Sequence, residues 1–377
     1  MHIVHVVEGS VVVKGGKESH LNRFIVESTA SGHRNSLVAD SISKVKGAED
    51  LIDITSNQRL SYAPDVILLH STRSWRLAKV MSKVAPTFAW VHDYAFVCPA
   101  SISWFRNTGQ VCNLPLGLHC VTNAYSKWCN ARRPDRNLKN YFVSRRSLSG
   151  VPYLRGVIVA SSYMKERLTV NLVPEELVHV LPYFVPDVGH EGAPQGGEKA
   201  NRILFVGRLS EVKGVELLLD ALALLPPEYE LVVAGDGYNR KNVEEHLKRT
   251  GVAEERVIFD GYVDSQERLQ SLYQSAAVVA IPSLWPEPFG IVGLEALKQG
   301  KPVVAFDVGG IREWLSDGNV GLLADPGDAR DLAAKLLQLL RDPARRRRLG
   351  LSGRKHVREN FSWDAHWTRF NRIVANQ

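Results

Sequence analysis

Short apolar runs alternate with helical patterns along this chain, and that alternation limits the folds open to it. In the first half, the runs that predict strands are Ile3–Val7, Ser36–Ala39, Val66–His70, Thr87–Val91, Val157–Ala160 and Val178–Leu181. Helical patterns between them cover Lys17–Ala30, Trp75–Lys83 and Lys139–Leu148. Strands that alternate with helices favour parallel sheets with crossover helices.

The second half repeats this architecture without repeating the sequence. Its predicted strands are Ile203–Val206, Leu231–Ala234, Val257–Phe259, Val278–Ile281, Pro302–Ala305 and Gly321–Leu323. A chain of 377 residues is too long for one ordinary core and fits two domains of about 150–200 residues. Asp187–Asn201 is rich in Gly and lacks large apolar residues, which is typical of a linker. We therefore predict a first domain over 1–186, a linker over 187–201 and a second domain over 202–360.

Two carboxylates, Glu287 and Glu295, lie eight residues apart around a predicted helix start. Pro286 and Pro288 keep Glu287 in a stiff loop, and helical periodicity begins at Ile291. Unpaired N–H groups at such a start, together with the helix dipole, favour an anion. The segment thus offers a phosphate seat between two acceptors of hydroxyl hydrogen bonds, which is what a nucleotide sugar needs.

Other candidate residues also follow predicted strands. Ligands of open α/β sheets bind outside the carboxyl ends of the strands. Gly15 and Gly16 follow the first strand and precede a helix, where glycine lets the backbone approach a diphosphate. Arg208 and Lys213 follow the strand that ends at Val206, and both can bind phosphate oxygens.

In their order along the chain, these motifs resemble those of the retaining family-4 glycosyltransferases. The run from Glu287 to Glu295 resembles the E-x7-E signature of that family, and Val206–Gly214 resembles its GRL…KG loop. The further matches are Gly15-Gly16, Phe259–Val263, Ser161–Lys165 and Ala305–Gly310. The resemblance covers nearly the whole chain.

The resemblance implies the GT-B fold, an α/β arrangement of two Rossmann-like domains whose parallel sheets face each other across a cleft. In that fold the last helix crosses back onto the first domain. The aromatic tail, residues 361–377, resembles this helix. A tail helix that packs only on the second domain stays open as an alternative.

The resemblance also implies roles for the residues of the second domain. Arg208 and Lys213 would stabilise the departing nucleoside diphosphate without a metal, although a surface ion-pair set with Glu211 is the plain alternative. Glu295 would accept from the ribose and Glu287 from the donor sugar. The remaining donor-binding residues are Phe289, Gly290 and Ile291 at the helix start, with Tyr262 and Val263 beside the base. Asp236 is more simply a turn former.

In the first domain, His92 and Asp93 end a predicted strand, and His92 matches a family histidine. His92 would orient the sugar or its phosphate. Asp93 would orient His92 or contact the acceptor. His70 and Ser71, at the end of the preceding strand, are weaker candidates.

All four cysteines, Cys98, Cys112, Cys120 and Cys129, fall in one loop of the first domain. Four thiols can bind a structural zinc, but no C-x2–4-C pair is present. Free thiols and disulfides therefore stay open beside zinc. The opening of this loop resembles a family subset that carries a cysteine-containing insertion. A loop this long, from Tyr94 to Arg133, is expected to shape the acceptor pocket.

Charge is uneven along the chain. The net charge is +7, and residues 1–186 hold 22 Lys and Arg against 13 Asp and Glu, a difference of +9. A basic first domain favours contact with anionic lipid or with a phosphate-linked acceptor. Nucleic acid is disfavoured because no recognisable binding module is present. The run Arg345–Arg348 is expected to be a solvated helix face.

We therefore predict a metal-independent, retaining hexosyltransferase that uses a GDP- or UDP-sugar and a glycan or lipid-linked acceptor, in polysaccharide or lipopolysaccharide biosynthesis. The alternatives are another GT-B enzyme, such as a nucleotide-sugar epimerase or a glycan phosphorylase, and a non-catalytic nucleotide-sugar-binding protein. No apolar run is long enough to span a membrane, and the first residues lack the layout of a signal peptide. We expect a cytoplasmic protein, peripheral at the inner face of the membrane.

Overall fold

The computed structural model describes residues 1–10, 16–41, 50–53, 63–186 and 199–375. The chain divides into two compact units. Unit 1 comprises Met1–Pro186 and Trp363–Gln377, and unit 2 comprises Asp187–Ser362. Most of the predicted linker lies outside the described residues.

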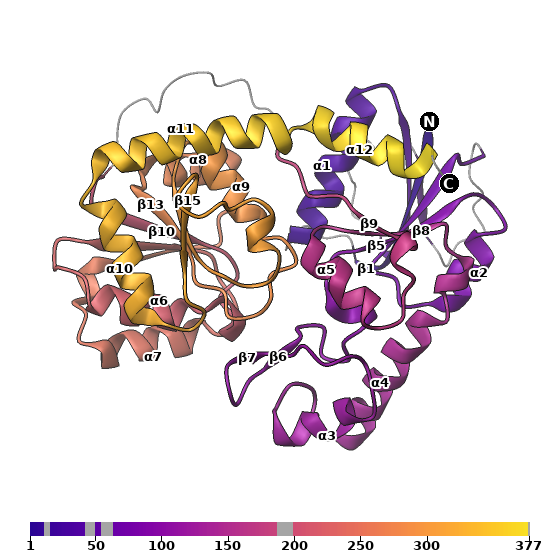
Figure 1. Ribbon diagram of the computed structural model, residues 1–377, viewed down its shortest axis with the longest axis horizontal. Coiled ribbons are helices and arrows are strands. Elements are labelled where there is room, and N and C mark those ends of the chain that lie inside the picture. Colours follow the sequence, from indigo (N-terminus) through magenta and orange to yellow (C-terminus); the bar gives the residue numbers. More distant parts are fainter. Residues whose placement is uncertain (11–15, 42–49, 54–62, 187–198, 376–377) are drawn as a thin grey trace. The chain divides into compact units, whose positions relative to one another are not determined.

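Unit 1 is built on a parallel sheet with strand order β3-β2-β1-β4-β5-β8-β9. Figure 1 labels β1, β5, β8 and β9 of this sheet. The strands are β1 His2–Ser10, β2 Arg34–Ser41, β3 Asp50–Asp53, β4 Val66–His70, β5 Thr87–Val91, β8 Gly156–Val159 and β9 Val178–Val180. Its helices are α1 Gly16–Ala30, α2 Trp75–Met81, α3 His119–Ser126, α4 Pro134–Leu148, α5 Ser162–Thr169 and α12 Trp363–Ala375. The predicted strands of this half all form. Strand β3 was not predicted, because an aspartate at each end hides its short apolar pair.

The core of unit 1 is aromatic and includes the end of the chain. Trp90 on β5, Phe24 on α1 and Phe370 on α12 are almost fully buried in one cluster. Burial of one such side chain stabilises the fold by about 1.5–3 kcal/mol. Trp363 and Trp367 pack partly buried against the same cluster. Helix α12 therefore belongs to the unit that begins the chain, although unit 2 separates the two in sequence.

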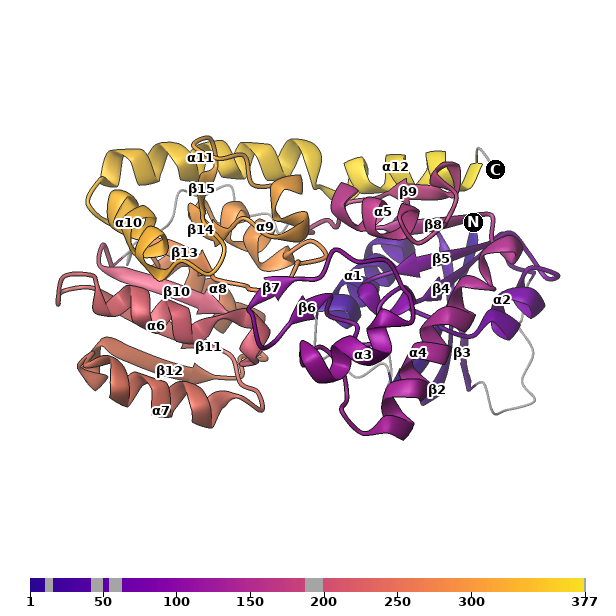
Figure 2. The same ribbon diagram turned by 60° about the horizontal axis from the view of Figure 1, so that its bottom comes forward.

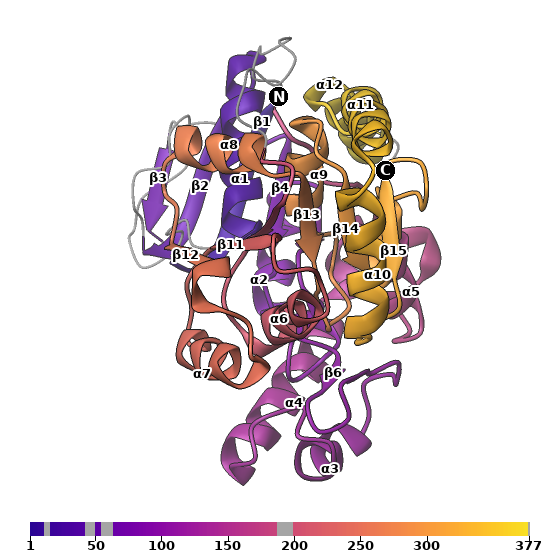
Figure 3. The same cartoon turned by 90° about the vertical axis from the view of Figure 1, so that its left-hand side faces the viewer.

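Unit 2 contains a second parallel sheet, with order β12-β11-β10-β13-β14-β15. The strands are β10 Arg202–Val206, β11 Glu230–Ala234, β12 Val257–Gly261, β13 Val278–Ile281, β14 Val303–Phe306 and β15 Gly321–Ala324. The helices are α6 Val215–Ala223, α7 Arg240–Thr250, α8 Gln266–Ser275, α9 Ile291–Lys298, α10 Ala329–Leu340 and α11 Pro343–Asn360. Helices α6, α7 and α10 lie on one face, and α8, α9 and α11 on the other (Figure 3).

The strand order of unit 2 reverses once. From β10 the chain moves outward to β12, then returns to place β13 on the other side of β10 and continues to β15. The crevice at such a reversal, outside the carboxyl ends of the strands, is where doubly wound sheets bind ligands. In unit 2 the reversal lies between β10 and β13.

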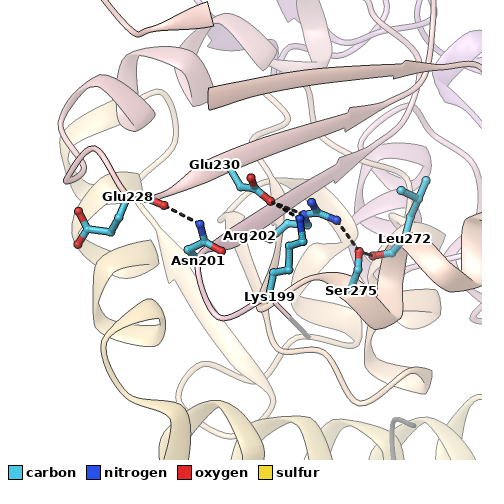
Figure 4. Close-up of polar contacts among 7 residues, drawn as sticks. All are labelled: Lys199, Asn201, Arg202, Glu228, Glu230, Leu272 and Ser275. Carbon is cyan, nitrogen blue, oxygen red and sulfur yellow. Dashed lines mark hydrogen bonds and ion pairs between the residues drawn. The ribbon is translucent and has the colours of Figure 1, made fainter. Parts of the chain in front are cut away.

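The opposite, amino-terminal end of this sheet is held by polar contacts (Figure 4). Arg202 Nε donates to Glu230 Oε1 at 2.6 Å, and Arg202 Nη1 donates to Ser275 Oγ at 3.2 Å. Asn201 Nδ2 donates to the carbonyl of Glu228 at 2.7 Å. These contacts join the starts of β10 and β11 to the end of α8, far along the strands from the reversal edge.

Helix starts follow ordinary capping chemistry. Ser161, directly after β8, accepts from the Met164 N–H, and Asp328 accepts from the N–H groups of Arg330 and Asp331. Asp342 caps α11 by accepting from the Arg345 N–H at 2.8 Å. Each such cap stabilises a helix by about 1 kcal/mol.

The Arg345–Arg348 run is only partly the solvated face that we expected. Arg346 is 4% exposed. Its Nη1 donates to the carbonyls of Leu339 and Leu340 at 2.9 and 2.8 Å, so it satisfies the last turn of α10. The prediction is wrong for this residue because a guanidinium can be buried where it pairs with unpaired helix carbonyls.

An insertion separates β5 from β8 in unit 1. It holds the antiparallel pair β6 Trp104–Phe105 and β7 Gln110–Val111, followed by α3 and α4, which contact each other (Figure 2). The 3₁₀ segments of the chain are η1 Tyr94–Phe96, η2 Val151–Tyr153, η3 Glu175–Leu177, η4 Glu211–Lys213, η5 Glu254–Arg256 and η6 Gly309–Glu313. Across the described ranges of both units, every helix is too short or too polar to cross a bilayer.

Candidate active site

The loops at the reversal edge of unit 2 begin at the same level of the sheet. Val206 at the end of β10 pairs with Ala234 at the end of β11, and Ala234 is opposite Gly261 of β12. On the other side, Ile281 of β13 pairs with Ala305 of β14. The predicted residues that follow these strands therefore share one edge of unit 2.

Lys213 and Glu287 meet at this edge. Lys213 Nζ lies 2.5 Å from Glu287 Oε1, and the Ser283 hydroxyl donates to the same oxygen at 2.5 Å. The Glu287 side chain is 5% exposed and that of Lys213 is 27% exposed. Lys213 Nζ also lies 5.5 Å from the centroid of the Trp285 ring. A buried carboxylate is costly unless it is paired and hydrogen-bonded, and here the Lys213 cation and the Ser283 hydroxyl provide both interactions.

Glycine allows the loops to approach this closely. Gly214, at φ +66°, would place a Cβ atom 1.9 Å from the Pro282 carbonyl oxygen. Gly309, at φ +55°, would place one 2.5 Å from the Glu287 carbonyl oxygen. The Gly310 N–H donates to that same carbonyl at 2.7 Å. Backbone from three loops therefore holds Glu287 in position.

Helix α9 begins next to this carboxylate. Gly290, at φ +83°, is its N-cap residue, and no side chain caps the helix. The Phe289 carbonyl accepts from Trp314 Nε1 at 2.6 Å, which fixes the chain just before the helix. Glu295, one turn further along, accepts from the Tyr273 hydroxyl of α8 at 3.1 Å. The start of α9, from Phe289 through Ile291, presents N–H groups at the reversal edge.

The other predicted residues of unit 2 lie along the same edge. Arg208 is exposed and lies two residues beyond the end of β10. Tyr262 and Val263 follow β12, which is the outermost strand and lies two strands from β10, and Tyr262 is 62% exposed. Asp236 Oδ1 accepts from the Gly237 N–H at 2.8 Å, as expected of a turn former.

In unit 1, His92 takes part in a chain of buried hydrogen bonds. Its Nδ1 is 2.7 Å from the Tyr183 hydroxyl and its Nε2 is 2.9 Å from His70 Nδ1. His70 Nε2 is 3.0 Å from His5 Nδ1, and His5 Nε2 is 3.1 Å from Asn35 Oδ1. Both ring nitrogens of His92 are thus engaged inside unit 1.

The neighbours of His92 lie at the carboxyl end of the same sheet. Asp93 is half-buried and accepts from the Ala95 N–H at 2.8 Å, so it caps η1. Ser71, at φ +50°, accepts from the His92 N–H at 3.3 Å. Gly16 begins α1, whereas Gly15 lies outside the described residues.

Comparison with known proteins connects this geometry to a family. Residues 192–356, nearly all of unit 2, match the family model described as glycosyl transferases group 1. Unit 2 is therefore similar to glycosyl transferases of group 1. The Lys213–Glu287 pair and the start of α9 lie within it.

Curated relatives match about half of the chain or less. An uncharacterized glycosyltransferase of Methanocaldococcus jannaschii is 39% identical over 164 residues, which is 43% of this chain and 41% of that protein. A D-inositol 3-phosphate glycosyltransferase of Corynebacterium aurimucosum is 34% identical over 220 residues, 54% of this chain and 52% of that protein. The chain thus spans about half the length of the curated relatives it matches.

Solved structures match the whole chain. HepE of Anabaena, crystallised with UDP and glucose, has a TM-score of 0.73 at 19% identity and covers 100% of both chains. Sucrose-phosphate synthase of Thermosynechococcus elongatus has a TM-score of 0.71 at 20% identity, covering 100% of this chain and 99% of its own. The predicted fold class, a GT-B protein of two α/β units with parallel sheets, is confirmed.

Sequence reasoning missed several contacts around the candidate site of unit 2. Ser283 contacts Glu287 and Trp285 contacts Lys213, and both residues precede the E-x7-E run. Tyr273 contacts Glu295 from another helix. A serine four residues before the first glutamate was the available signal for Ser283. For Tyr183, 91 residues from His92, no local signal exists.

The four cysteines are free, half-buried thiols, so the disulfide alternative is not found. Burial, and less strongly the neighbouring cysteines, raise the pKa of Cys112, Cys120 and Cys129, that of Cys129 to about 12. The thiols are therefore near one another. Yet no group of three or more His, Cys, Asp or Glu side chains within the described ranges is arranged to hold a metal ion. Structural zinc at these cysteines stays a prediction.

Proposed function

We propose that this chain is a retaining glycosyltransferase that transfers a hexosyl unit from a nucleoside diphosphate sugar, GDP- or UDP-linked, to a glycan or lipid-linked acceptor. The observation that carries the proposal is the Lys213–Glu287 pair at the strand-order reversal of unit 2, which is similar to glycosyl transferases of group 1. The solved relative with UDP and glucose supports a nucleotide-sugar donor. Assembly of a polysaccharide or lipopolysaccharide is the setting that we propose.

In this proposal, the diphosphate of the donor lies at the start of α9. Backbone N–H groups at this helix start, the Arg208 guanidinium and the Lys213 ammonium stabilise negative charge as the sugar–phosphate bond breaks. The acceptor oxygen forms its bond to the anomeric carbon on the face that the leaving group vacates. The acceptor proton passes to the departing phosphate oxygen. Charge on the leaving group is then balanced by this chain's own residues, without a metal ion.

Glu287 would hold the transferred sugar. Both of its hydrogen-bond donors, Lys213 and Ser283, reach Oε1, so Oε2 is the atom that accepts from a sugar hydroxyl. Lys213 thereby contacts both the diphosphate and Glu287, the carboxylate that binds the sugar. Glu295, held by Tyr273, would accept from the ribose. Tyr262 and Val263 would lie beside the base.

A matched pair of carboxylate variants tests this assignment. Glu287 and Glu230 each pair with a cation, at the reversal edge and at the amino-terminal end of the same sheet. Glu287→Gln should lower kcat about 100-fold or more, the cost of one preorganised polar contact in the transition state. Glu230→Gln should leave kcat within about twofold. Equal effects of the two variants on transfer would contradict the proposal.

We also propose that α4 of unit 1 contacts an anionic membrane surface. Between Tyr94 and Ala160 the chain has nine Lys and Arg residues and one acidic residue, Asp135. Leu138 and Phe142, 44% and 51% exposed, lie one turn apart on α4. Exposed basic residues flank them, namely Arg136, Lys139, Arg145 and Arg146. Apolar anchors amid cations favour anionic lipid.

Sedimentation with lipid vesicles tests the membrane proposal. We expect binding to phosphatidylglycerol vesicles that weakens with salt, and none to phosphatidylcholine vesicles. Reversing both charges at Arg145 and Arg146 to Glu should abolish it. Reversing the exposed Arg347 and Arg348 of α11 provides the matched control and should have little effect. Binding that survives the α4 variant would place the contact elsewhere.

A further inference from the structure

Three buried histidines of unit 1 come from three neighbouring strands and form one hydrogen-bonded chain. His5 lies within β1, His70 ends β4 and His92 follows β5. They are 0%, 1% and 5% exposed. Their rings stack in series, with centroids 5.2 Å apart at each step. Such an array is costly to bury unless every ring nitrogen is satisfied.

Asn35 lies at one end of this series of hydrogen bonds and determines which atom donates in each of them. Asn35 Nδ2 lies 2.9 Å from Thr29 Oγ1, 2.9 Å from Ser28 Oγ and 3.4 Å from the His33 carbonyl oxygen. The carbonyl can only accept, so the amide nitrogen faces that side and Oδ1 faces His5. His5 Nε2 must therefore carry the proton.

The remaining protons follow from the first. A contact between two neutral imidazoles needs one N–H and one lone pair. Since His5 Nδ1 is then an acceptor, His70 Nε2 donates to it, and His92 Nε2 in turn donates to His70 Nδ1. His92 Nδ1 accepts from the Tyr183 hydroxyl at 2.7 Å. One amide thus orders four hydrogen bonds across the sheet.

We propose that Asn35, His5, His70 and Tyr183 are positioning residues that hold His92 as its neutral Nε2–H tautomer at the carboxyl end of β5. This inference rests on the proposed function, since it assigns these residues to the His92–Asp93 turn, which we expect to orient the sugar or to contact the acceptor. Both ring nitrogens of His92 are engaged within unit 1. In this proposal the hydrogen-bonded array therefore orients the turn, in place of the direct contact with the sugar or its phosphate that we expected of His92.

The surroundings favour neutral rings. His20 of α1 stacks on Tyr183 with ring centroids 4.1 Å apart, and His366 of α12 lies 5.6 Å from His20. Burial lowers the pKa of His5 to about 4. Burial, then His366 and His92, lowers the pKa of His20. The charged groups that act on this cluster are Arg23 and Glu18 of α1 and Asp93 beside His92.

His366 provides an internal control. Its Nδ1 lies 2.8 Å from the Pro182 carbonyl oxygen, which can only accept. His366 is therefore the opposite tautomer, with the proton on Nδ1, in the same buried region.

Imidazole ¹⁵N spectra of histidine-labelled protein test the inference without any transfer assay. At pH 7 we expect His5, His70 and His92 to show a protonated Nε2 and a lone pair on Nδ1, and His366 the reverse. Tyr183→Phe should shift the His92 Nδ1 resonance. Tyr163→Phe, which removes a hydroxyl bonded to Asn113 elsewhere in unit 1, should leave it unchanged. An Nδ1–H tautomer or an imidazolium at any of the three positions would overturn the inference.

The role in positioning is tested by kinetics on the same variants. Tyr183→Phe should lower kcat about tenfold with little change in the KM of the donor, and should move the acidic limb of the pH profile. Asn35→Asp places a carboxylate beside His5 and should make His5 an imidazolium near neutral pH. If the wild-type tautomers are as expected but kcat is unchanged in both variants, only the positioning role is refuted. Absence of transfer in the wild type would instead refute the proposed function and leave the tautomer result standing.

Discussion

Lys213 Nζ lies 2.5 Å from Glu287 Oε1, joining the loop after β10 to the loop after β13. The two residues are 74 positions apart in sequence. They meet because the strand order reverses between these two strands, so their carboxyl-end loops are neighbours.

Replacement of Lys213 by Met should separate binding from turnover. The methionine keeps the length of the side chain but removes the cation from the diphosphate and from Glu287. We expect kcat to fall at least 100-fold in steady-state transfer assays at saturating donor. The control is Lys199→Met, which removes a cation 4.0 Å from Glu230 at the other end of the sheet. Normal turnover by Lys213→Met would remove this residue from the site.

Gly214→Ala should destabilise unit 2 far more than Gly318→Ala, a replacement that causes similar backbone strain but no steric clash. Gly214 and Gly318 have φ of +66° and +75°, but only at Gly214 would a Cβ meet backbone, the Pro282 carbonyl. Gly318→Ala should cost about 1–2 kcal/mol from the left-handed conformation. Gly214→Ala should cost at least about 2 kcal/mol more. Urea unfolding of both variants measures the difference, and equal costs would show that the loops separate easily.

Unit 1 should lose stability in mild acid. Burial lowers the pKa of His5 to about 4, that of His366 to about 3, and that of His20 as well. The unfolded chain binds protons at these residues near pH 6.5, whereas the folded chain does not. Stability is therefore complete above pH 6.5 and falls as the pH drops toward 4. For His5 alone the loss amounts to about 3 kcal/mol.

His20→Leu tests the cause of this acid sensitivity. Within the described structure both ring nitrogens of His20 lack hydrogen-bond partners, so leucine removes a titrating group without breaking a bond. The slope of unfolding free energy against pH, between pH 6 and 5, should fall by about 1.4 kcal/mol per pH unit. Urea unfolding across that range measures the slope. An unchanged slope would mean that other groups cause the acid loss.

The insertion thiols should react slowly. Because the pKa of Cys129 is raised to about 12, iodoacetamide at pH 8 should alkylate it at least tenfold more slowly than free cysteine. Mass spectrometry of timed samples measures the rate. The competing prediction, structural zinc, would instead give one zinc per chain and joint protection of all four cysteines until a chelator is added.

Local patterns predicted much of this protein. Buried parallel strands are continuous apolar runs, so Val66–His70 and Thr87–Val91 were predicted at the bounds at which they form. Arg208, Lys213, Glu287 and Glu295 were predicted as site residues because each follows a strand or opens a helix. Strand β3 was not found, because aspartates at both ends of Asp50–Asp53 hide its apolar pair.

The sequence by itself determined the two α/β sets and the motifs at their strand ends, because hydrophobic periodicity and turn chemistry act within about a dozen residues. Only the tertiary structure decided which side chains meet. It joined Lys213 to Glu287 and Ser283, placed Phe370 of the last helix in the core of unit 1, buried Arg346, and ordered His5, His70 and His92 between Asn35 and Tyr183. Those contacts depend on strand order and on angstrom-scale hydrogen-bond geometry between residues far apart in the chain, and neither leaves a periodic trace in the sequence.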